Sequence, residues 1–280
     1  MEITRQMIEA YRQELQKREK SEATQEKYIR DVSRFYRWLN HQEISKEAVI
    51  EYKQSLVGEY QVSSLNSMLI SINGFLGFCG LGEYQVKLLK VQKKQFVDTE
   101  REMTKEEYQK LLQMAKEKGN ERLFMLMQTI CSTGIRVSEH QYITVEALAL
   151  RKAVVSNKGK VRQIFFPEKL LKELNEYCKR RRITSGPIFV TKYGNPVNRS
   201  NIWGDMKSLC EEAGLEKRKV FPHNLRHLFA FTYYDMEKDL THLADILGHS
   251  SIETTRIYTL TSKNDFEEKL SKMDLVGLFF

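Results

Sequence analysis

Residues 222–260, PHNLRHLFAFTYYDMEKDLTHLADILGHSSIETTRIYTL, bring phosphate-binding side chains together with a side chain that attacks phosphorus. The planar fork of Arg226 holds two phosphate oxygens at once, and the imidazoles of His223 and His249 donate to a third oxygen or move a proton. The hydroxyl of Tyr258 serves as a nucleophile. The chain has no phosphate-binding glycine loop and no zinc-ligand spacing. We therefore expect the function to reside in this stretch, most of which is predicted to be helical.

The length and charge of the chain favour two domains and a polyanionic partner. Its 280 residues exceed what one simple core needs and fall short of three ordinary domains. Lysine and arginine number 45 against 37 aspartates and glutamates, and the isoelectric point is about 9.1. This balance favours nucleic acid as the partner. On charge alone, a basic soluble protein without such a partner is the alternative.

The cysteines and the N-terminus indicate a reducing compartment. The four cysteines form no C-x-x-C pair, which is typical of free thiols inside the fold. The N-terminus lacks the apolar core of a secretion signal, and no apolar run approaches the roughly 20 residues that cross a bilayer. The sequence therefore predicts a cytoplasmic protein that does not contact a membrane.

A helical domain is expected over residues 1–86. Glycines at 80 and 82 end its helical pattern. Apolar side chains recur at helical spacing in four segments, which lie at 4–17, 28–39, 46–57 and 62–79.

A basic segment over residues 87–102 follows this domain. It loses the apolar periodicity and contains Lys90, Lys93 and Lys94. A solvated loop is the ordinary explanation for such a run of charge. A linker between two domains is also where a chain that encircles a duplex would cross its phosphate backbone, so these lysines are candidate DNA contacts.

The remaining residues, 103–280, are expected to form a second domain of mainly helical structure with a small antiparallel sheet. Thr104 and Glu107 have the spacing of a capping box at the start of its first helix. The β-prone runs within 153–166 flank a tight turn and predict a hairpin. A short strand is predicted at Ile188–Val190, followed by a turn that ends at Pro196.

Six polar residues of this domain, taken with their neighbours, resemble the tyrosine recombinase family, also called the phage integrases. The resemblance covers the whole second domain and, more loosely, the first, and the two-domain layout is Xer-like. It implies a mainly α protein with a SAM-like helical core-binding domain and a mixed α/β catalytic domain. The matching pieces are TGIRVSE around Arg136, the hairpin Lys158, HNLRH with His223 and Arg226, and LGHSSIETTRIYT with His249 and Tyr258.

The resemblance implies transfer of DNA strands without a metal ion, ATP or another cofactor. Tyr258 would attack a DNA phosphodiester and conserve its energy in a 3′-phosphotyrosyl bond. Arg136 and Arg226 would clamp the non-bridging oxygens of the phosphate. His223 is the candidate general base, and His249 would add a hydrogen bond to the phosphate.

Two further positions have alternatives. Lys158, at the hairpin tip, would protonate the leaving 5′ oxygen, and Lys160 lies close enough in the sequence to compete for that role. Glu139 matches the supporting acidic position of the family, whereas an ordinary surface carboxylate fits the sequence equally well. Arg199 and Asn201, at the start of a predicted helix, are candidate DNA contacts.

The expected function is site-specific recombination of double-stranded DNA, as integration, excision, resolution or inversion, of the kind found on mobile elements. The family acts as a tetramer that pairs two duplexes, and an accessory directionality protein is a possible partner. The apolar end of the chain, DLVGLFF, would pack on a neighbouring protomer or fold back on its own domain. The alternatives are a type IB topoisomerase-like enzyme that relaxes DNA, and a regulator that binds DNA without the reaction.

Overall fold

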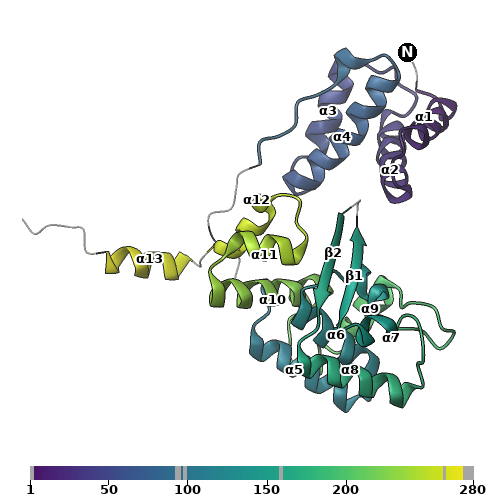
Figure 1. Ribbon diagram of the computed structural model, residues 1–280. Helices are drawn as coiled ribbons and strands as arrows, with labels where there is room; N and C mark the ends of the chain where they lie inside the picture. The colour runs from purple at the N-terminus through teal and green to yellow at the C-terminus, as the bar shows by residue number, and fades with distance from the viewer. Residues whose placement is uncertain (1–2, 92–95, 97–99, 158–159, 261–262, 274–280) are drawn as a thin grey trace, which may run out of the picture. The chain divides into compact units, whose positions relative to one another are not determined.

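The computed structural model describes residues 3–91, 96, 100–157, 160–260 and 263–273 (Figure 1). The chain divides into two compact units, Met1–Lys93 and Lys94–Phe280. The described residues are largely helical and contain one two-stranded antiparallel sheet. This confirms the predicted fold class. The expected domain boundaries at 86 and 103 stay predictions.

The N-terminal unit is built from helices whose apolar faces meet in one core. Thr4 and Ser45 cap the first and third helices, since each hydroxyl accepts a hydrogen bond from a backbone N–H of the first turn. Phe35 and Phe75 are fully buried at the centre. The elements are α1 (Arg5–Lys17), α2 (Glu22–Leu39), α3 (Lys46–Leu56), α4 (Val62–Phe78) and the short η1 (Gly82–Tyr84).

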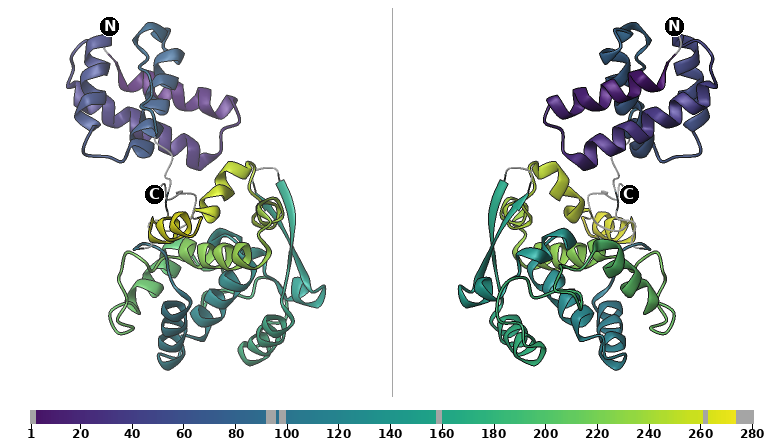
Figure 2. Two further views of the ribbon diagram at one scale, coloured as in Figure 1. Left: turned by 90° about the vertical axis from the view of Figure 1, so that its left-hand side faces the viewer. Right: turned by 90° about the vertical axis from the view of Figure 1, so that its right-hand side faces the viewer.

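The C-terminal unit encloses a larger apolar core around α6 (Glu121–Thr133). α6 packs against α5, α8 and α10, and the hairpin stands beside α11 (Figures 1 and 2). The other elements are α5 (Lys105–Glu117), η2 (Val137–Tyr142), α7 (Val145–Ala149), β1 (Lys152–Asn157), β2 (Lys160–Phe165), α8 (Glu168–Arg181), α9 (Arg199–Ser208), α10 (Pro222–Glu237), α11 (Leu240–Leu247), α12 (Ile252–Thr255), η3 (Arg256–Thr259) and α13 (Lys263–Lys272).

Two local signals in the sequence mark helix ends, and the first of them confirms the predicted capping box. Thr104 and Glu107 form a reciprocal capping box at the start of α5. Gly134 ends α6 in the left-handed conformation, at φ 65°. A residue without a Cβ atom adopts this conformation at little cost, so the chain turns sharply here.

The hairpin buries one face and exposes the other. β1 and β2 pair in antiparallel register from Lys152 opposite Phe165 to Asn157 opposite Lys160. Val155 and Ile164 are buried, whereas Phe165 is exposed. This alternation follows from the two-residue period of a strand.

The prediction of a strand at Ile188–Val190 is wrong. Within the described ranges this segment forms only isolated bridges, from Thr144 to Pro187 and from Val190 to Pro196. The two bridges lead to different parts of the chain, so the segment has no continuous partner strand along which a hydrogen-bonded ladder could extend.

No helix in the described part of the chain is long and apolar enough to cross a membrane. The same residues contain no group of three or more His, Cys, Asp and Glu side chains placed to hold a metal ion. The cysteines are unpaired thiols; Cys178 and Cys210 are buried, whereas Cys79 and Cys131 are half-buried.

Candidate active site

Three of the predicted catalytic residues line one cavity of about 610 Å³ in the C-terminal unit. Arg136 precedes η2, and His223 and Arg226 lie on the first turns of α10. Arg199 and Trp203 border the cavity from α9. Two guanidinium groups and an imidazole thus meet at one concave surface, which suits an anion.

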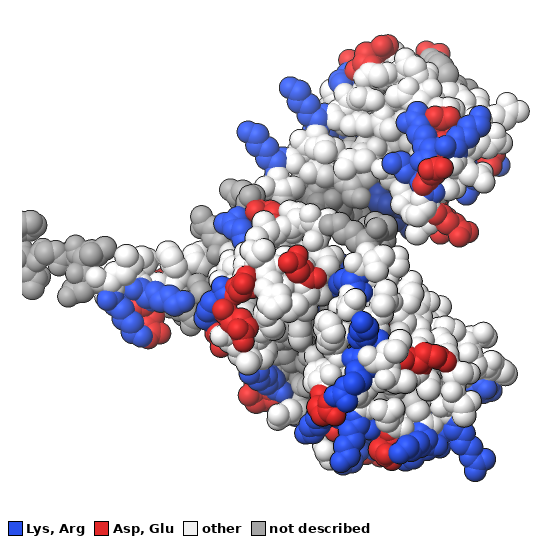
Figure 3. Space-filling view, viewed as in Figure 1, with Lys and Arg blue, Asp and Glu red and all other residues white. Residues whose placement is uncertain are grey.

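A second concave region of the same unit has a different character. It measures about 640 Å³ and alternates basic with acidic side chains, among them Lys172, Glu173, Glu176 and Arg180 of α8. Figure 3 shows blue and red side chains intermingled over α5 and α8. A surface of mixed sign offers a polyanion little net attraction, so the cavity at Arg226 is the candidate site.

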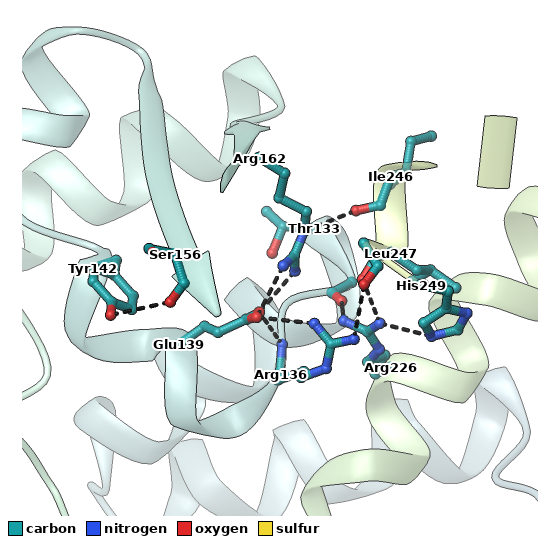
Figure 4. A network of polar contacts seen from close by, with 12 residues as sticks. Thr133, Arg136, Glu139, Tyr142, Ser156, Arg162, Arg226, Ile246, Leu247 and His249 are labelled. Carbon is teal, nitrogen blue, oxygen red and sulfur yellow. Dashed lines mark hydrogen bonds and ion pairs between the residues drawn. The ribbon is translucent and has the colours of Figure 1, made fainter. Parts of the chain in front are cut away.

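Arg226 is held by the backbone, and it is 1% exposed. Its Nη1 donates to Gly134 O at 2.6 Å, and its Nη2 donates to Leu247 O at 2.7 Å (Figure 4). Nη2 also lies 3.0 Å from His249 Nε2. Burial, and then the charge of Arg136, lower the pKa of Arg226 to about 9. The group is therefore charged at neutral pH, in a place where an incoming anion would relieve the cost of its burial.

We expect Gly134→Ala to destabilise the protein by about 2 to 4 kcal/mol, because a left-handed alanine is strained and its Cβ overpacks the core. That Cβ would lie 2.5 Å from the ring of Phe229 and 3.2 Å from Leu247. The measurement is urea unfolding. Gly119→Ala is the matched control, because Gly119 also has a positive φ (66°) but has no atom within 4 Å of the added Cβ. Equal losses for the two variants would contradict the packing argument.

Glu139 is a buried carboxylate that joins two arginines. It is 2% exposed and accepts a hydrogen bond from the backbone N–H of Arg136 at 2.7 Å and from Arg136 Nη1 at 3.1 Å. Arg162 Nη1 and Nη2 donate to its two oxygens at 2.9 and 2.7 Å. Of the two interpretations of Glu139, the surface carboxylate is wrong.

Arg162 was not among the predicted site residues. Its Nε donates to Ile246 O in the last turn of α11 at 3.1 Å, and Arg136 Nη2 donates to Gly248 O, two residues later, at 3.2 Å. The two arginines thus connect Glu139 with the end of α11 (Figure 4). The available signal was its place in β2, on the same face as the buried Ile164, where a cation needs a partner.

The stability of the protein should depend on the charge of Glu139. Burial alone would raise the pKa of Glu139, but hydrogen bonds from Arg162 and from the Arg136 backbone outweigh it and hold the pKa at about 2. A lowered pKa contributes stability that is fully present above about pH 4.5 and is lost as the pH falls through the folded value, here roughly 3 kcal/mol. We expect Glu139→Gln to be less stable than the natural protein at pH 7.

The test is urea unfolding of both proteins between pH 7 and pH 2.5. The difference in their free energies of unfolding should shrink as the pH falls below 4.5. Glu176→Gln is the control, because Glu176 forms an exposed pair with Lys179 and its loss should change little. A difference that stays constant with pH would contradict the prediction.

The hydrogen bonds of His249 define its tautomer. A guanidinium group only donates, so Nε2 of His249 accepts from Arg226. Nδ1 then carries the proton and donates to Thr255 Oγ1 at 2.8 Å. Burial, followed by the charges of Arg226 and Arg136, lowers the pKa of His249 to about 4. The ring is neutral at pH 7.

His223 is also neutral. Burial, then the neighbouring His227 and the charge of Arg226, lower its pKa to about 4. A neutral imidazole beside two cationic groups is able to accept a proton at neutral pH.

Tyr258 lies on η3 and is 3% exposed. Its ring packs edge-on against Phe231 of α10 at a centroid distance of 5.1 Å. Burial raises its pKa to about 12, although the positive charges of Arg226 and Arg136 act in the opposite direction. The hydroxyl is therefore protonated at neutral pH and needs a base before it can attack.

Several predicted residues lie apart from this cluster or outside the described residues. Lys158, Lys93 and Lys94 are not described. Asn201 is exposed on α9, and Lys90 is exposed in the N-terminal unit.

Known proteins resemble both units. Residues 101–265 match the phage integrase family, and residues 8–79 match the phage integrase N-terminal SAM-like domain. The tyrosine recombinase XerA of Pyrococcus furiosus is 30% identical over 227 residues, which cover 78% of this chain and 76% of that protein. The tyrosine recombinase XerH of Campylobacter jejuni is 28% identical over 254 residues, covering 83% and 72%.

Solved structures share the fold at lower identity. The XerH recombinase bound to its difH substrate aligns with a TM-score of 0.68 and 20% identity, over 89% of this chain and 79% of that one. The lambda integrase tetramer bound to a Holliday junction aligns with a TM-score of 0.72 and 17% identity, over 90% and 76%.

The chain belongs to the phage integrase family. Its named relatives are tyrosine recombinases, and it is accordingly a site-specific recombinase of the tyrosine type.

Proposed function

We propose that Tyr258 cuts and rejoins double-stranded DNA at a phosphodiester held by Arg136 and Arg226. The observation that carries this assignment is the cavity itself, where both guanidinium groups and His223 line one concave surface. A phosphodiester presents two non-bridging oxygens, which match two cationic donors. Both donors strengthen their hydrogen bonds as the five-coordinate transition state gains negative charge.

The proposed reaction conserves the energy of the broken bond. Tyr258 Oη forms a bond to phosphorus, its proton passes to His223, and the bond from phosphorus to the 5′ oxygen breaks. The leaving oxygen takes a proton, which we assign to Lys158, and the 3′ phosphate stays on the tyrosine. The reverse sequence, with a new 5′ hydroxyl, rejoins the strand.

His249 contributes through its bond to Arg226. In the described arrangement its Nε2 accepts from that arginine, so it orients the guanidinium group. Donation from His249 to the phosphate, as the family resemblance implies, requires a proton on Nε2. The negative charge of a bound phosphodiester favours that protonation.

We extend the proposal to the wider assembly. Lys90, Lys93, Lys94, Arg199 and Asn201 contact DNA outside the site, and four protomers pair two duplexes in the cytoplasm. Arg199 has direct support, because it borders the same cavity as Arg136 and Arg226. An accessory protein for directionality completes the proposed set of partners.

The test is capture of a covalent protein–DNA adduct. The protein is incubated with fragments of its own genomic DNA and denatured, the attached fragments are sequenced, and a duplex nicked near the recovered cleavage point is then synthesised. We expect the adduct to form on this nicked duplex and its peptide to contain a phosphotyrosine at position 258. DNA binding without any adduct would support the non-catalytic regulator and overturn the proposal.

A second assay separates recombination from relaxation. A plasmid with two copies of the recovered site should yield deletion or inversion products. A type IB topoisomerase-like enzyme would relax plasmids with or without these sites and would leave the order of the segments unchanged.

A further inference from the structure

A histidine outside the proposed catalytic set lies against the nucleophile. His227 follows Arg226 on α10, and its ring is edge-on to Tyr258 at a centroid distance of 5.6 Å and an interplanar angle of 81°. The same ring lies 4.6 Å from that of His223, at 63°. One imidazole therefore contacts both the proposed nucleophile and its proposed base.

A carboxylate fixes this ring in place. His227 Nδ1 lies 3.1 Å from Glu102 Oε2 and 3.4 Å from Oε1. The two side chains are 16% and 26% exposed, so both are largely removed from water. A carboxylate only accepts, so Nδ1 carries a proton toward it, and the plane of the ring is set by this bond.

Glu102 itself stands on an anchored segment. The carbonyl of the preceding residue, Arg101, accepts a hydrogen bond of 2.7 Å from the side chain of Asn224, and the next residue, Met103, is buried. The backbone on both sides of Glu102 is therefore held against the rest of the C-terminal unit. Its carboxylate is a fixed support for the His227 ring.

We infer that the Glu102–His227 pair is a positioning device, which holds the ring of Tyr258 in line with the phosphate and beside His223. This role rests on the proposed function, because it requires Tyr258 to be the nucleophile. The contribution is geometric. The negative charge of Glu102 opposes formation of the phenolate, so the pair does not activate Tyr258 by electrostatics.

The geometry explains why the pair matters for the rate. If the bond to Glu102 is removed, the imidazole is free to rotate, and both edge contacts are lost together. Because Tyr258 is buried, a change in the orientation of the His227 ring also changes the position of the Tyr258 ring. A misplacement of about 1 Å in a reacting group costs on the order of 10²-fold in rate.

The experiment measures the single-turnover rate of adduct formation on the nicked duplex, the DNA concentration at half-saturation, and the melting temperature. We expect Glu102→Ala, which removes the acceptor, and His227→Ala to slow adduct formation about 10- to 100-fold with half-saturation within a few-fold of the natural protein. His227→Asn keeps a donor near the position of Nδ1 and should recover part of the rate.

Glu107→Ala is the matched control. Glu107 ties the start of α5 to Lys219, 2.8 Å away and just before α10, and its other oxygen accepts from the backbone N–H of Thr104. Its removal should lower the melting temperature and leave the rate nearly unchanged. Unchanged adduct rates in Glu102→Ala and His227→Ala would overturn the inference, and so would a fall of the adduct rate in Glu107→Ala as large as theirs. If the natural protein forms no adduct through Tyr258, the proposed function fails first, and the two failures are thereby distinguished.

Discussion

Replacement of Tyr258 by phenylalanine should abolish the covalent protein–DNA adduct. The variant keeps the ring that packs against Phe231 and loses only the hydroxyl, so its fold and DNA affinity should be unchanged. No other group would replace the nucleophile, and we expect adduct formation to fall by at least about 10⁴-fold. The measurement is denaturing gel electrophoresis of the protein after incubation with the nicked duplex.

Tyr233→Phe and Tyr234→Phe are the matched controls, because both residues lie on α10 within 25 positions of the nucleophile in the sequence and pack near it. Tyr233 has its own partner, since its hydroxyl is 2.8 Å from His242 Nδ1. Both variants should form the adduct at the natural rate. An undiminished adduct in Tyr258→Phe would assign the nucleophile to another residue.

Arg226→Lys should reduce adduct formation by about 10²- to 10³-fold. A lysine has one ammonium group in place of the fork that reaches Gly134 O and Leu247 O together. The site lowers the pKa of Arg226 to about 9, mainly through burial. The same environment lowers the pKa of an ammonium group, which starts from a lower value, and drives it toward the neutral form. The variant thus loses both the second hydrogen-bonding arm of the guanidinium group and part of its positive charge.

Two comparisons isolate this effect from a general loss of structure. Arg122→Lys changes another partly buried arginine of the same unit, which donates to Val190 O at 3.1 Å and does not line the cavity. Its adduct should form at nearly the natural rate. Arg136→Lys should be slow, like Arg226→Lys, with less effect on the melting temperature, because the Arg136 side chain is 28% exposed. If Arg226→Lys and Arg136→Lys both formed the adduct as fast as the natural protein, the two arginines could not be the groups that hold the phosphate.

Helices and their ends were predictable from the sequence because their signals are local. The capping box at Thr104 and the glycine at 134 act within a few residues, and the structure contains both. The segment Ile188–Val190 has an apolar composition typical of a strand, but a strand needs a continuous partner. Pairing depends on residues elsewhere in the chain, and the two bridges of this segment lead to two different partners.

In the candidate site, too, the features set by local sequence were predictable and those set by distant residues were not. The motifs predicted its members in the stretch 222–260, and two of them, His223 and Arg226, share a cavity with Arg136 from a distant part of the chain. The burial of Glu139 was open in the sequence, since a carboxylate three residues after an arginine is equally common on a surface. Its burial follows from Arg162, which approaches from a hairpin 23 positions away. Only the folded chain brings these charges together.

The attachment of Arg226 to main-chain carbonyls bears on how such enzymes diverge. Every residue has a carbonyl oxygen, so the acceptors at 134 and 247 survive substitution of the side chains as long as the backbone path is kept. This agrees with a fold shared at a TM-score of 0.72 with only 17% identity. The two acceptors therefore constrain the backbone more than the side chains, although Leu247 is itself fully buried and Gly134 has no room for a Cβ atom, so both positions stay restricted by packing.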